Sequence, residues 1–242
     1  MVTICFDFGN SKRKAGIFTG DAFSEEIYLP DDSEECISSI LKRYSPGAII
    51  LSSVINHREG LEEQLSQAAP FHKLSNLTRL NFTVSVSKPE TVGADRLALA
   101  AAAAKFLPGK NTLVIALGSC ITYNFVNQYA QFLGGSISPG LSMRFRAMHE
   151  YTAKLPLVQE DWNFPLIGYD TRTNLQSGVI LGMASEIDGI IHHYRERFGN
   201  FNAVLTGGNS AYFATLLKSR IFADHNFLFK GLYALSQLNC IP

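Results

Sequence analysis

The sequence lacks an excess of charge of either sign. Its 242 residues include 21 Lys and Arg against 21 Asp and Glu, so the formal net charge at pH 7 is zero. Proteins that bind nucleic acid or anionic membranes through their overall charge carry a surplus of basic residues. The balance therefore argues against a nucleic-acid partner and against a membrane partner.

Cysteine and long apolar runs are scarce as well. The four cysteines are far apart and form no CxxC pair, which argues against a structural zinc site. Cys5 and Cys120 lie in apolar, strand-like runs, which predicts buried thiols. The longest apolar run, residues 97–104, is far too short to span a bilayer, and Asp7 interrupts the N-terminus where a secretory leader would be apolar. With 46% hydrophobic residues the chain can bury a substantial core, and we expect a cytoplasmic protein.

What the sequence does contain is the same succession of strand, small-residue turn and strand near the start of each half. Residues 2–6 and 15–18 flank Gly9-Asn10-Ser11, and residues 112–117 and 120–126 flank Gly118-Ser119. Apolar, partly β-branched runs around glycine are typical of hairpins. Because helical segments follow in both halves and Pro108-Gly109 separates them, we predict a duplicated α/β fold with lobes at 1–108 and 109–242.

Further elements are predicted from apolar periodicity and from helix start and stop residues. Helices are expected over 34–44, 59–67, 93–107, 141–155, 174–198 and 211–220. Strands are expected over 47–55, over 129–140 with a glycine-rich turn at its end, and over 201–210 with a Gly-Gly turn at its end. The glycines of the 174–198 helix indicate a face that packs closely against a neighbour.

The stretch Asp7-Phe8-Gly9-Asn10-Ser11 places a carboxylate at a strand end, directly before a glycine turn. Main-chain amides in such a turn can bind phosphate oxygens, and the acid can orient a hydrated Mg²⁺. One of the three basic residues that follow, at 12–14, could reach the β- or γ-phosphate. The alternative is a plain hairpin turn, which is far commoner.

Gly93-Ala94-Asp95-Arg96 opens an otherwise apolar helix. An acid at a helix start is favoured by the helix dipole alone, but an arginine there is not, so Arg96 needs a partner such as the carboxylate of a ligand. The glycine-rich stretches at 133–140 and 205–209 place backbone close to a neighbour, and the second is a turn of the kind that accepts a flat nucleoside. Each also has an interpretation as a simple tight turn.

Taken in order, these pieces resemble type III pantothenate kinases. The matching pieces are Asp7-x-Gly-Asn-Ser, Gly93-Ala-Asp-Arg96, Gly118-Ser-x-x-Thr122, Gly134-Gly-x-Ile-x-Pro-Gly140, TAKLPLV at 152–158, Asp170-Thr171 with Gly178, and Thr206-Gly-Gly208. They cover nearly the whole chain, and the GGxIxPG–TAxLP combination is highly specific. The resemblance implies the sugar-kinase, actin and chaperone ATPase superfamily: two ribonuclease-H-like lobes with ATP between them. It also implies a homodimer whose pantothenate site lies at the subunit interface.

The resemblance further implies the reaction, ATP-dependent phosphorylation of pantothenate to 4′-phosphopantothenate at the start of coenzyme A synthesis, and the residues that serve it. The implied ATP-binding residues are Asp7, Phe8, Gly9, Asn10, Ser11, Lys12, Arg13, Lys14, Ser119, Gly207 and Gly208, with Asp7 also holding Mg²⁺ through water. The implied pantothenate-binding residues are Gly93, Ala94, Asp95, Arg96 and, from the other subunit, Thr171. Asp95 would be the general base toward the primary hydroxyl, and an unperturbed pKa suffices because the proton leaves late in a loose transition state.

Three positions depart from the family pattern. Ala116 stands where the family has an acid that binds a monovalent cation, K⁺ or ammonium, Asn124 replaces a second acid, and Val86 replaces a tyrosine that lines the substrate site in many members. Three interpretations stay open: an active pantothenate kinase, a catalytically weakened nucleotide- or pantothenate-binding or regulatory protein, and a kinase for another small alcohol. The intact acids Asp7 and Asp95 favour the first, and without an acid at position 116 we expect weak ATP binding that responds little to K⁺.

Overall fold

The computed structural model describes residues 1–240, which form two compact units. Unit 1 comprises Met1–Gly109, Val126–Leu133 and the segment from Asn226 onward, and unit 2 comprises Lys110–Phe125 and Gly134–His225. The first boundary lies beside the predicted junction at 108/109. The segment from Asn226 onward, which the sequence placed with the second lobe, groups by its contacts with unit 1.

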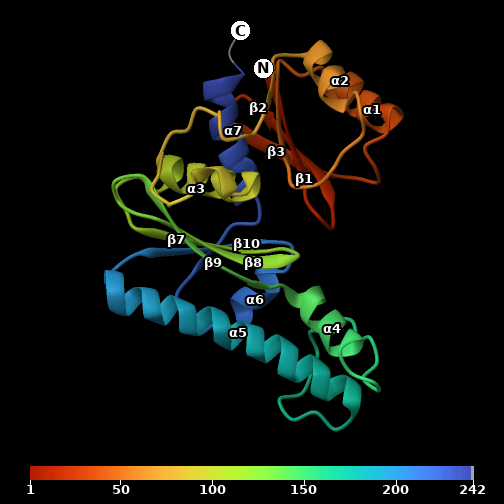
Figure 1. The fold of residues 1–242 in the computed structure, drawn as a ribbon, viewed down its shortest axis with the longest axis vertical. Helices are drawn as coiled ribbons and strands as arrows, with labels where there is room; N and C mark the ends of the chain where they lie inside the picture. Colours follow the sequence, from red (N-terminus) through yellow and green to blue (C-terminus); the bar gives the residue numbers. More distant parts are fainter. Residues whose placement is uncertain (241–242) are drawn as a thin grey trace. The chain divides into compact units, whose positions relative to one another are not determined.

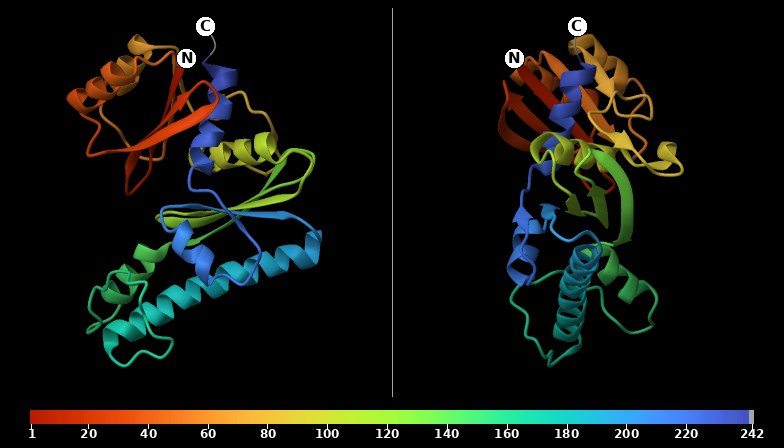
Figure 2. Two further views of the ribbon diagram at one scale, coloured as in Figure 1. Left: turned by 180° about the vertical axis from the view of Figure 1, so that it is seen from behind. Right: turned by 90° about the vertical axis from the view of Figure 1, so that its left-hand side faces the viewer.

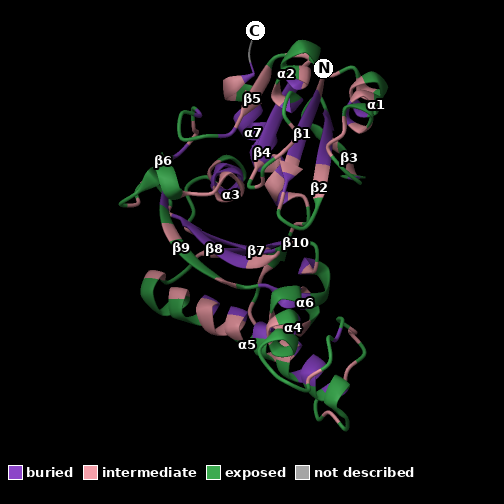
Figure 3. Cartoon of the chain, turned by 45° about the vertical axis from the view of Figure 1, so that its right-hand side comes forward, coloured by how far each residue is buried: buried purple, intermediate pink, exposed green. Residues whose placement is uncertain are grey.

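Unit 1 is built on a five-stranded sheet with the order β3-β2-β1-β4-β5. The strands are β1 (Val2–Phe8), β2 (Arg13–Thr19), β3 (Ala22–Leu29), β4 (Ala48–Ser53) and β5 (Phe71–Lys73). The β1–β2 and β2–β3 pairs are antiparallel, whereas β1–β4 and β4–β5 are parallel. The central strands β1 and β4 are largely buried (Figure 3).

Helices cover both faces of this sheet (Figure 1). One face carries α1 (Glu34–Tyr44) and α2 (Leu61–Ala68), and the other carries α3 (Ala94–Phe106) and α7 (Phe227–Asn239). A short 3₁₀ helix, η1 (Pro89–Thr91), precedes α3. Because side chains alternate along a strand, Ile4, Phe6 and Phe8 enter the core beneath α1 and α2. Gly16 faces the other way, and a Cβ there would lie 2.5 Å from the ring of Phe229 in α7.

Helices α3 and α7 approach each other at backbone distance. A Cβ on Gly231 of α7 would lie 1.8 Å from the carbonyl oxygen of Ala98 in α3. The run of alanines at 100–103 in α3 is fully or almost fully buried. Small side chains on both helices therefore permit a contact that larger ones would block.

A second sheet has the order β11-β10-β7-β8-β9-β6. Its strands are β6 (Thr83–Val84), β7 (Thr112–Leu117), β8 (Cys120–Val126), β9 (Gln131–Pro139), β10 (Asn202–Gly207) and β11 (Phe222–Ala223). In unit 2 the long helix α5 (Thr171–Phe198) runs along one face of this sheet (Figure 2). It is joined by α4 (Leu141–Glu150) and α6 (Ser210–Leu216), and the apolar side chains between sheet and helices form the core of the unit.

The predicted helices and strands are present, but several of their bounds differ, and the strands β3, β5, β6 and β11 were not predicted. α6 ends at Leu216 rather than at 220. β9 continues through the stretch predicted as a glycine-rich turn, because Gly135, with φ +147°, lets the strand approach β8 where a Cβ would lie 1.9 Å from the carbonyl oxygen of Tyr123. α4 ends at Glu150 rather than near 155, since the Thr152 hydroxyl donates a hydrogen bond to the carbonyl oxygen of Met148 (2.6 Å). α5 begins earlier, at Thr171. α7 was not predicted at all.

Two further predictions from the sequence concern the cysteines and membrane-spanning segments. Cys5 is buried as predicted, whereas Cys120 is only half-buried, and all four cysteines are free thiols. Among the described residues, no helix has the length and the apolar character needed to cross a membrane.

Candidate active site

Asp7 stands near the end of β1, just before the tight turn into β2. The amide of Gly9 donates to the carbonyl oxygen of Lys12 (3.0 Å) and closes this turn. The residues between them, 10 and 11, are exposed, whereas the side chain of Phe8 is fully buried in the core. Of the residues predicted to bind phosphate, Phe8 therefore offers only its main chain.

The three cations of the predicted phosphate loop differ in what surrounds them. Lys14 pairs with Glu26 (2.9 Å) and Arg13 with Asp32 (3.3 Å), both within unit 1. Lys12 is exposed. Because a cation already held by a carboxylate has less to gain from a phosphate, Lys12 is the best placed of the three to meet one.

Asp95 lies in the first turn of α3, and its carboxylate folds back over Gly93. A Cβ at Gly93 would lie 2.6 Å from Asp95 Oδ1, so a side chain there would push the carboxylate away. Burial raises the pKa of Asp95 by more than the backbone amide and charge of Arg96 lower it. The raised pKa differs from the ordinary pKa expected for Asp95 from the sequence. Arg96 stacks its guanidinium 5.5 Å from the ring centroid of Phe132, also in unit 1.

The structure brings Asp7 and Asp95 into electrostatic contact. Burial, the nearby Asp95 carboxylate and Glu26 together raise the pKa of Asp7 to about 7, against the opposing charge of Lys14. Two carboxylates with raised pKa values in one place are typical of sites that bind a cation or move a proton.

One polar group beside Asp7, Ser52, lies in the strand predicted over 47–55 and was not predicted as a site residue. Ser52 is paired with Asp7 in the parallel β1–β4 register, so both side chains lie on the same face. The Ser52 hydroxyl is fully buried and has no hydrogen-bond partner among the described residues. A buried hydroxyl of this kind is commonly satisfied by water or an ion, which fits a hydrated divalent cation at Asp7.

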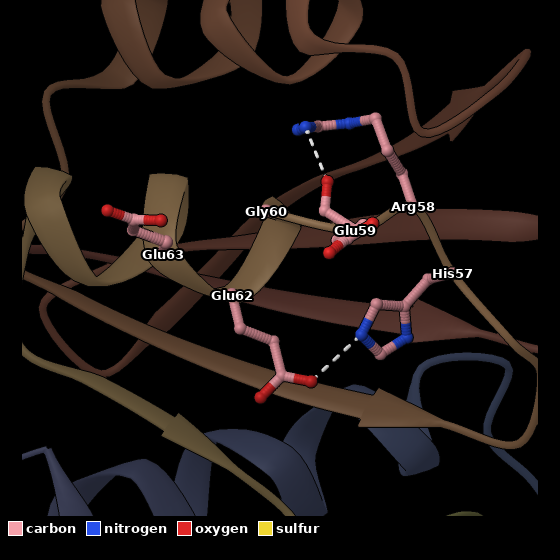
Figure 4. Close-up of a pocket in the computed structure, with 6 residues that line it drawn as sticks. All are labelled: His57, Arg58, Glu59, Gly60, Glu62 and Glu63. Atoms are coloured by element: carbon pink, nitrogen blue, oxygen red, sulfur yellow. Dashed lines mark hydrogen bonds and ion pairs between the residues drawn. The ribbon is translucent and has the colours of Figure 1, made fainter.

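Two cavities open on unit 1. The first, of about 390 Å³, is lined by residues 57–60, 62 and 63, where Glu62 pairs with the Nε2 of His57 at 2.9 Å (Figure 4). It contains none of the predicted site residues, and three glutamates on its wall disfavour an anionic ligand. The second, of about 360 Å³, is lined in part by Ser53, Val92, Ala94 and Leu97. It therefore adjoins the predicted substrate motif 93–96.

In unit 2 the predicted nucleotide residues gather at the ends of two parallel strands. β7 leads into the Gly118–Ser119 turn and β10 into Gly207–Gly208, with Gly207 paired to Leu117 in the register. Gly207 has φ +98°, and a Cβ on it would lie 2.3 Å from the carbonyl oxygen of Leu117. Ligands bind at the carboxyl ends of parallel strands, where glycine lets the backbone come close.

Gly140, from the GGxIxPG motif, packs on the same turn. Its amide donates to the carbonyl oxygen of Ser119 (3.1 Å), and a Cβ on it would lie 2.3 Å from the carbonyl oxygen of Gly118. These close approaches fix the backbone of the Gly118–Ser119 turn against residues 139–140 and 207.

The three residues that depart from the family pattern lie on or beside strands of the second sheet. Ala116 is paired with Thr206 across the β7–β10 register. Asn124 is fully buried, and its amide donates to Thr122 Oγ1 (3.0 Å) and to the carbonyl oxygen of Val114 (3.3 Å). The amide thus ties β8 to β7. Val86, in unit 1, is half-buried just after β6.

Thr171 is the first residue of α5 and is exposed. Asp170 caps this helix by accepting from the amide of Thr173 (2.7 Å). Thr171 therefore occupies a fixed position on the surface of unit 2.

The α/β fold, with two sheets and a carboxylate near the end of its first strand, is the fold of the sugar kinases. The fold is shared with a ROK family glucokinase from Streptomyces griseus solved with glucose and AMPPNP (TM-score 0.54, 12% identity, covering 99% of both chains). It is also shared with a Baf family protein from Campylobacter jejuni (TM-score 0.61, 20% identity, covering 98% of both chains).

The sequence comparisons are more specific. The family model of type III pantothenate kinase matches residues 3–193. The type III pantothenate kinase of Christiangramia forsetii is 37% identical over 240 residues, covering 98% of this chain and 99% of the relative. That of Bacteroides fragilis is 36% identical over 239 residues, covering 98% of both. The chain belongs to the type III pantothenate kinase family.

Proposed function

We propose that this protein transfers the γ-phosphoryl group of ATP to the primary hydroxyl of pantothenate, the first step of coenzyme A synthesis. The observation that carries the proposal is the placement of Asp95, in a chain of this family, beside both Asp7 and a cavity of about 360 Å³. A regulatory or merely binding role is not favoured, because Asp7, Asp95 and the glycines of both turns are present.

Asp95 acts as the general base. Its raised pKa makes the ionised carboxylate a stronger proton acceptor than an ordinary aspartate. Arg96 and the Gly93–Ala94 backbone would orient pantothenate, since a guanidinium suits the carboxylate of that substrate. Positioning of this kind is the main contribution of a protein to phosphoryl transfer.

ATP and a divalent cation are the co-substrate and cofactor of this family's reaction. Asp7 would hold the cation through water, with Ser52 beside it, and the cation would supply charge neutralisation to the phosphates. The exposed turn at 9–12, including Lys12, would bind phosphate oxygens. Ser119, Gly207 and Gly208 would contact the nucleotide. A monovalent cation would bind weakly here, because Ala116 offers no carboxylate.

The protein is further proposed to be a homodimer, with Thr171 reaching the partner's substrate. Large apolar side chains just before α5 support this. Leu166, Ile167 and Tyr169 are 78%, 82% and 81% exposed, and large apolar side chains left exposed within four residues favour an interface. Gly178 of α5 has open space around its Cβ position. Light scattering coupled to size exclusion should give twice the chain mass, and a monomer at micromolar concentration would contradict the shared site. The cytoplasmic location stays a prediction.

The reaction is tested directly. Purified protein with ATP, Mg²⁺, K⁺ and pantothenate should produce phosphopantothenate, which mass spectrometry detects. Asp95→Asn should abolish transfer while keeping nucleotide binding, because the amide has the shape of the carboxylate but is no base. Asp161→Asn, at an exposed surface carboxylate, is the matched control. Product formation by Asp95→Asn at the natural rate would remove Asp95 from the mechanism.

A further inference from the structure

Arg144 lies in the first turn of α4, where a positive charge is disfavoured by the helix dipole. Its side chain is nevertheless held on three sides. Nε donates to the carbonyl oxygen of Pro139 (2.8 Å), Nη2 donates to Ser138 Oγ (2.9 Å), and Nη2 also pairs with the carboxylate of Glu186 in α5. The arginine therefore ties the end of β9 to helix α5.

Glu186 is fixed in its turn by the sheet. Its Oε1 accepts from the hydroxyl of Tyr123 (3.0 Å), and the Tyr123 side chain on β8 is fully buried. Burial pushes the pKa of Glu186 up, but hydrogen bonds from Ser138, Arg144 and Tyr123 outweigh it and the pKa falls below its usual value. The carboxylate is thus ionised and fully engaged.

The segment that Arg144 holds is the one that packs on the Gly118–Ser119 turn. Pro139 is followed by Gly140, whose amide bonds the carbonyl oxygen of Ser119 and whose Cα leaves no room for a Cβ against Gly118. Because packed backbone transmits displacement rather than absorbing it, a shift of residues 138–140 moves the turn as well.

We propose that Arg144 and Glu186 are positioning residues for nucleotide binding: they fix the Gly118–Ser119 turn through Pro139 and Gly140 without touching the nucleotide. The inference rests on the proposed function only in taking this turn as a nucleotide contact. A half-buried ion pair contributes little net stability, whereas three directional bonds from one guanidinium fix a backbone position well.

The same helix offers a matched control. Asp188, two residues beyond Glu186, also anchors a backbone segment, accepting from the amides of Lys218 and Ser219 (2.9 Å each). That segment is not the Gly118–Ser119 turn. Asp188→Asn therefore removes a comparable anchor from the same helix while leaving the turn in place.

The test compares Glu186→Gln with Asp188→Asn by calorimetric titration of Mg²⁺ and a non-hydrolysable ATP analogue, below the unfolding temperature of each variant. Glu186→Gln should weaken nucleotide binding about tenfold, which corresponds to roughly 1.4 kcal/mol, whereas Asp188→Asn should leave it unchanged. Where turnover is measured, KM for ATP should rise while KM for pantothenate stays constant. Arg144→Lys, which keeps the charge but loses the fork of donors, should show the same rise and serves if Glu186→Gln does not fold.

Equal nucleotide affinity in Glu186→Gln, Arg144→Lys and the natural protein would overturn the inference, as would an equal loss in Asp188→Asn. Natural protein that binds the analogue but forms no phosphopantothenate would refute the proposed reaction and leave this inference standing. Natural protein that binds no nucleotide would refute both.

Discussion

Asp7→Asn should stabilise the folded protein while abolishing phosphoryl transfer. In the folded chain burial and the neighbouring Asp95 carboxylate raise the pKa of Asp7 from 3.8 to about 7. Near neutral pH this carboxylate is ionised in the unfolded chain without an energetic cost. In the folded chain its ionisation costs free energy. The natural residue therefore lowers the free energy of unfolding, and an amide of the same shape does not.

The sign and size of the change in unfolding free energy follow from the difference in the pKa of Asp7 between the folded and unfolded chain. Protonated Asp7 contributes stability that is complete below pH about 4 and is lost as the pH rises through about 7. A pKa raised from 3.8 to about 7 corresponds to roughly 4 kcal/mol when the carboxyl is ionised. Since the amide needs hydrogen-bond partners of its own, we expect Asp7→Asn to gain about 2–4 kcal/mol at pH 8 and little at pH 4.

Urea denaturation followed by circular dichroism measures this gain at several pH values, in buffer without Mg²⁺ or nucleotide. Asp161→Asn, at the exposed carboxylate that pairs with Arg172 (3.4 Å), should change stability by no more than about 0.5 kcal/mol. A difference between Asp7→Asn and the natural protein that does not grow between pH 4 and pH 7 would refute the reasoning.

Three further predictions concern the glycines and Ala116. Gly231→Ala should destabilise the protein by about 1–3 kcal/mol in urea denaturation, because the new methyl group meets the α3 backbone. The control Gly189→Ala, with open space in α5, should be neutral or stabilising by up to about 1 kcal/mol. Equal effects of the two substitutions would contradict the α3–α7 contact. Gly207→Ala should reduce both stability and ATP affinity, whereas Gly208→Ala, with open space around it, should reduce ATP affinity alone; unchanged affinity in both would remove this turn from the nucleotide site. Ala116→Asp should add K⁺ dependence to ATP binding, measured by titration with Na⁺ holding the ionic strength constant, and strong K⁺ activation of the natural protein would contradict our interpretation of the alanine.

Local signals in the sequence were enough for most of the fold. The hairpin around Gly9, the alanine-rich α3 and the hairpin around Gly118 follow from apolar runs and turn residues close to one another in the chain. The order of the motifs along the chain then indicated the family. The site residues Asp7 and Asp95 were identified separately, but their electrostatic coupling depends on how α3 packs against β4, the neighbour of β1 in the sheet, which no local pattern records.

The features that the sequence did not predict also depend on contacts between residues far apart in the chain. The glycines of β9 predict a turn from sequence, because nothing nearby in the chain shows that Tyr123 on the neighbouring strand needs the space. α7 lacks a capping side-chain hydrogen bond at its start, and most of its residues are buried. An apolar run of this kind does not by itself distinguish a buried helix from a strand. The roles of Ser52 and Glu186 depend on partners far away in the chain, and only the structure supplies those partners.

The contact between α3 and α7 also has a consequence for how the protein is made. Gly231 and Ala98 meet at backbone distance in unit 1, yet residues 110–225 lie mostly in unit 2 and are synthesised between them. At a translation rate of about 5–20 residues per second, the ribosome needs roughly ten seconds for this insertion. During that interval the alanine face of α3 has no helix against it, so unit 1 is completed only after the chain of unit 2 has emerged. A nascent chain stalled before residue 226 should therefore expose this face and bind chaperones, and the fold of the first-made unit is finished last.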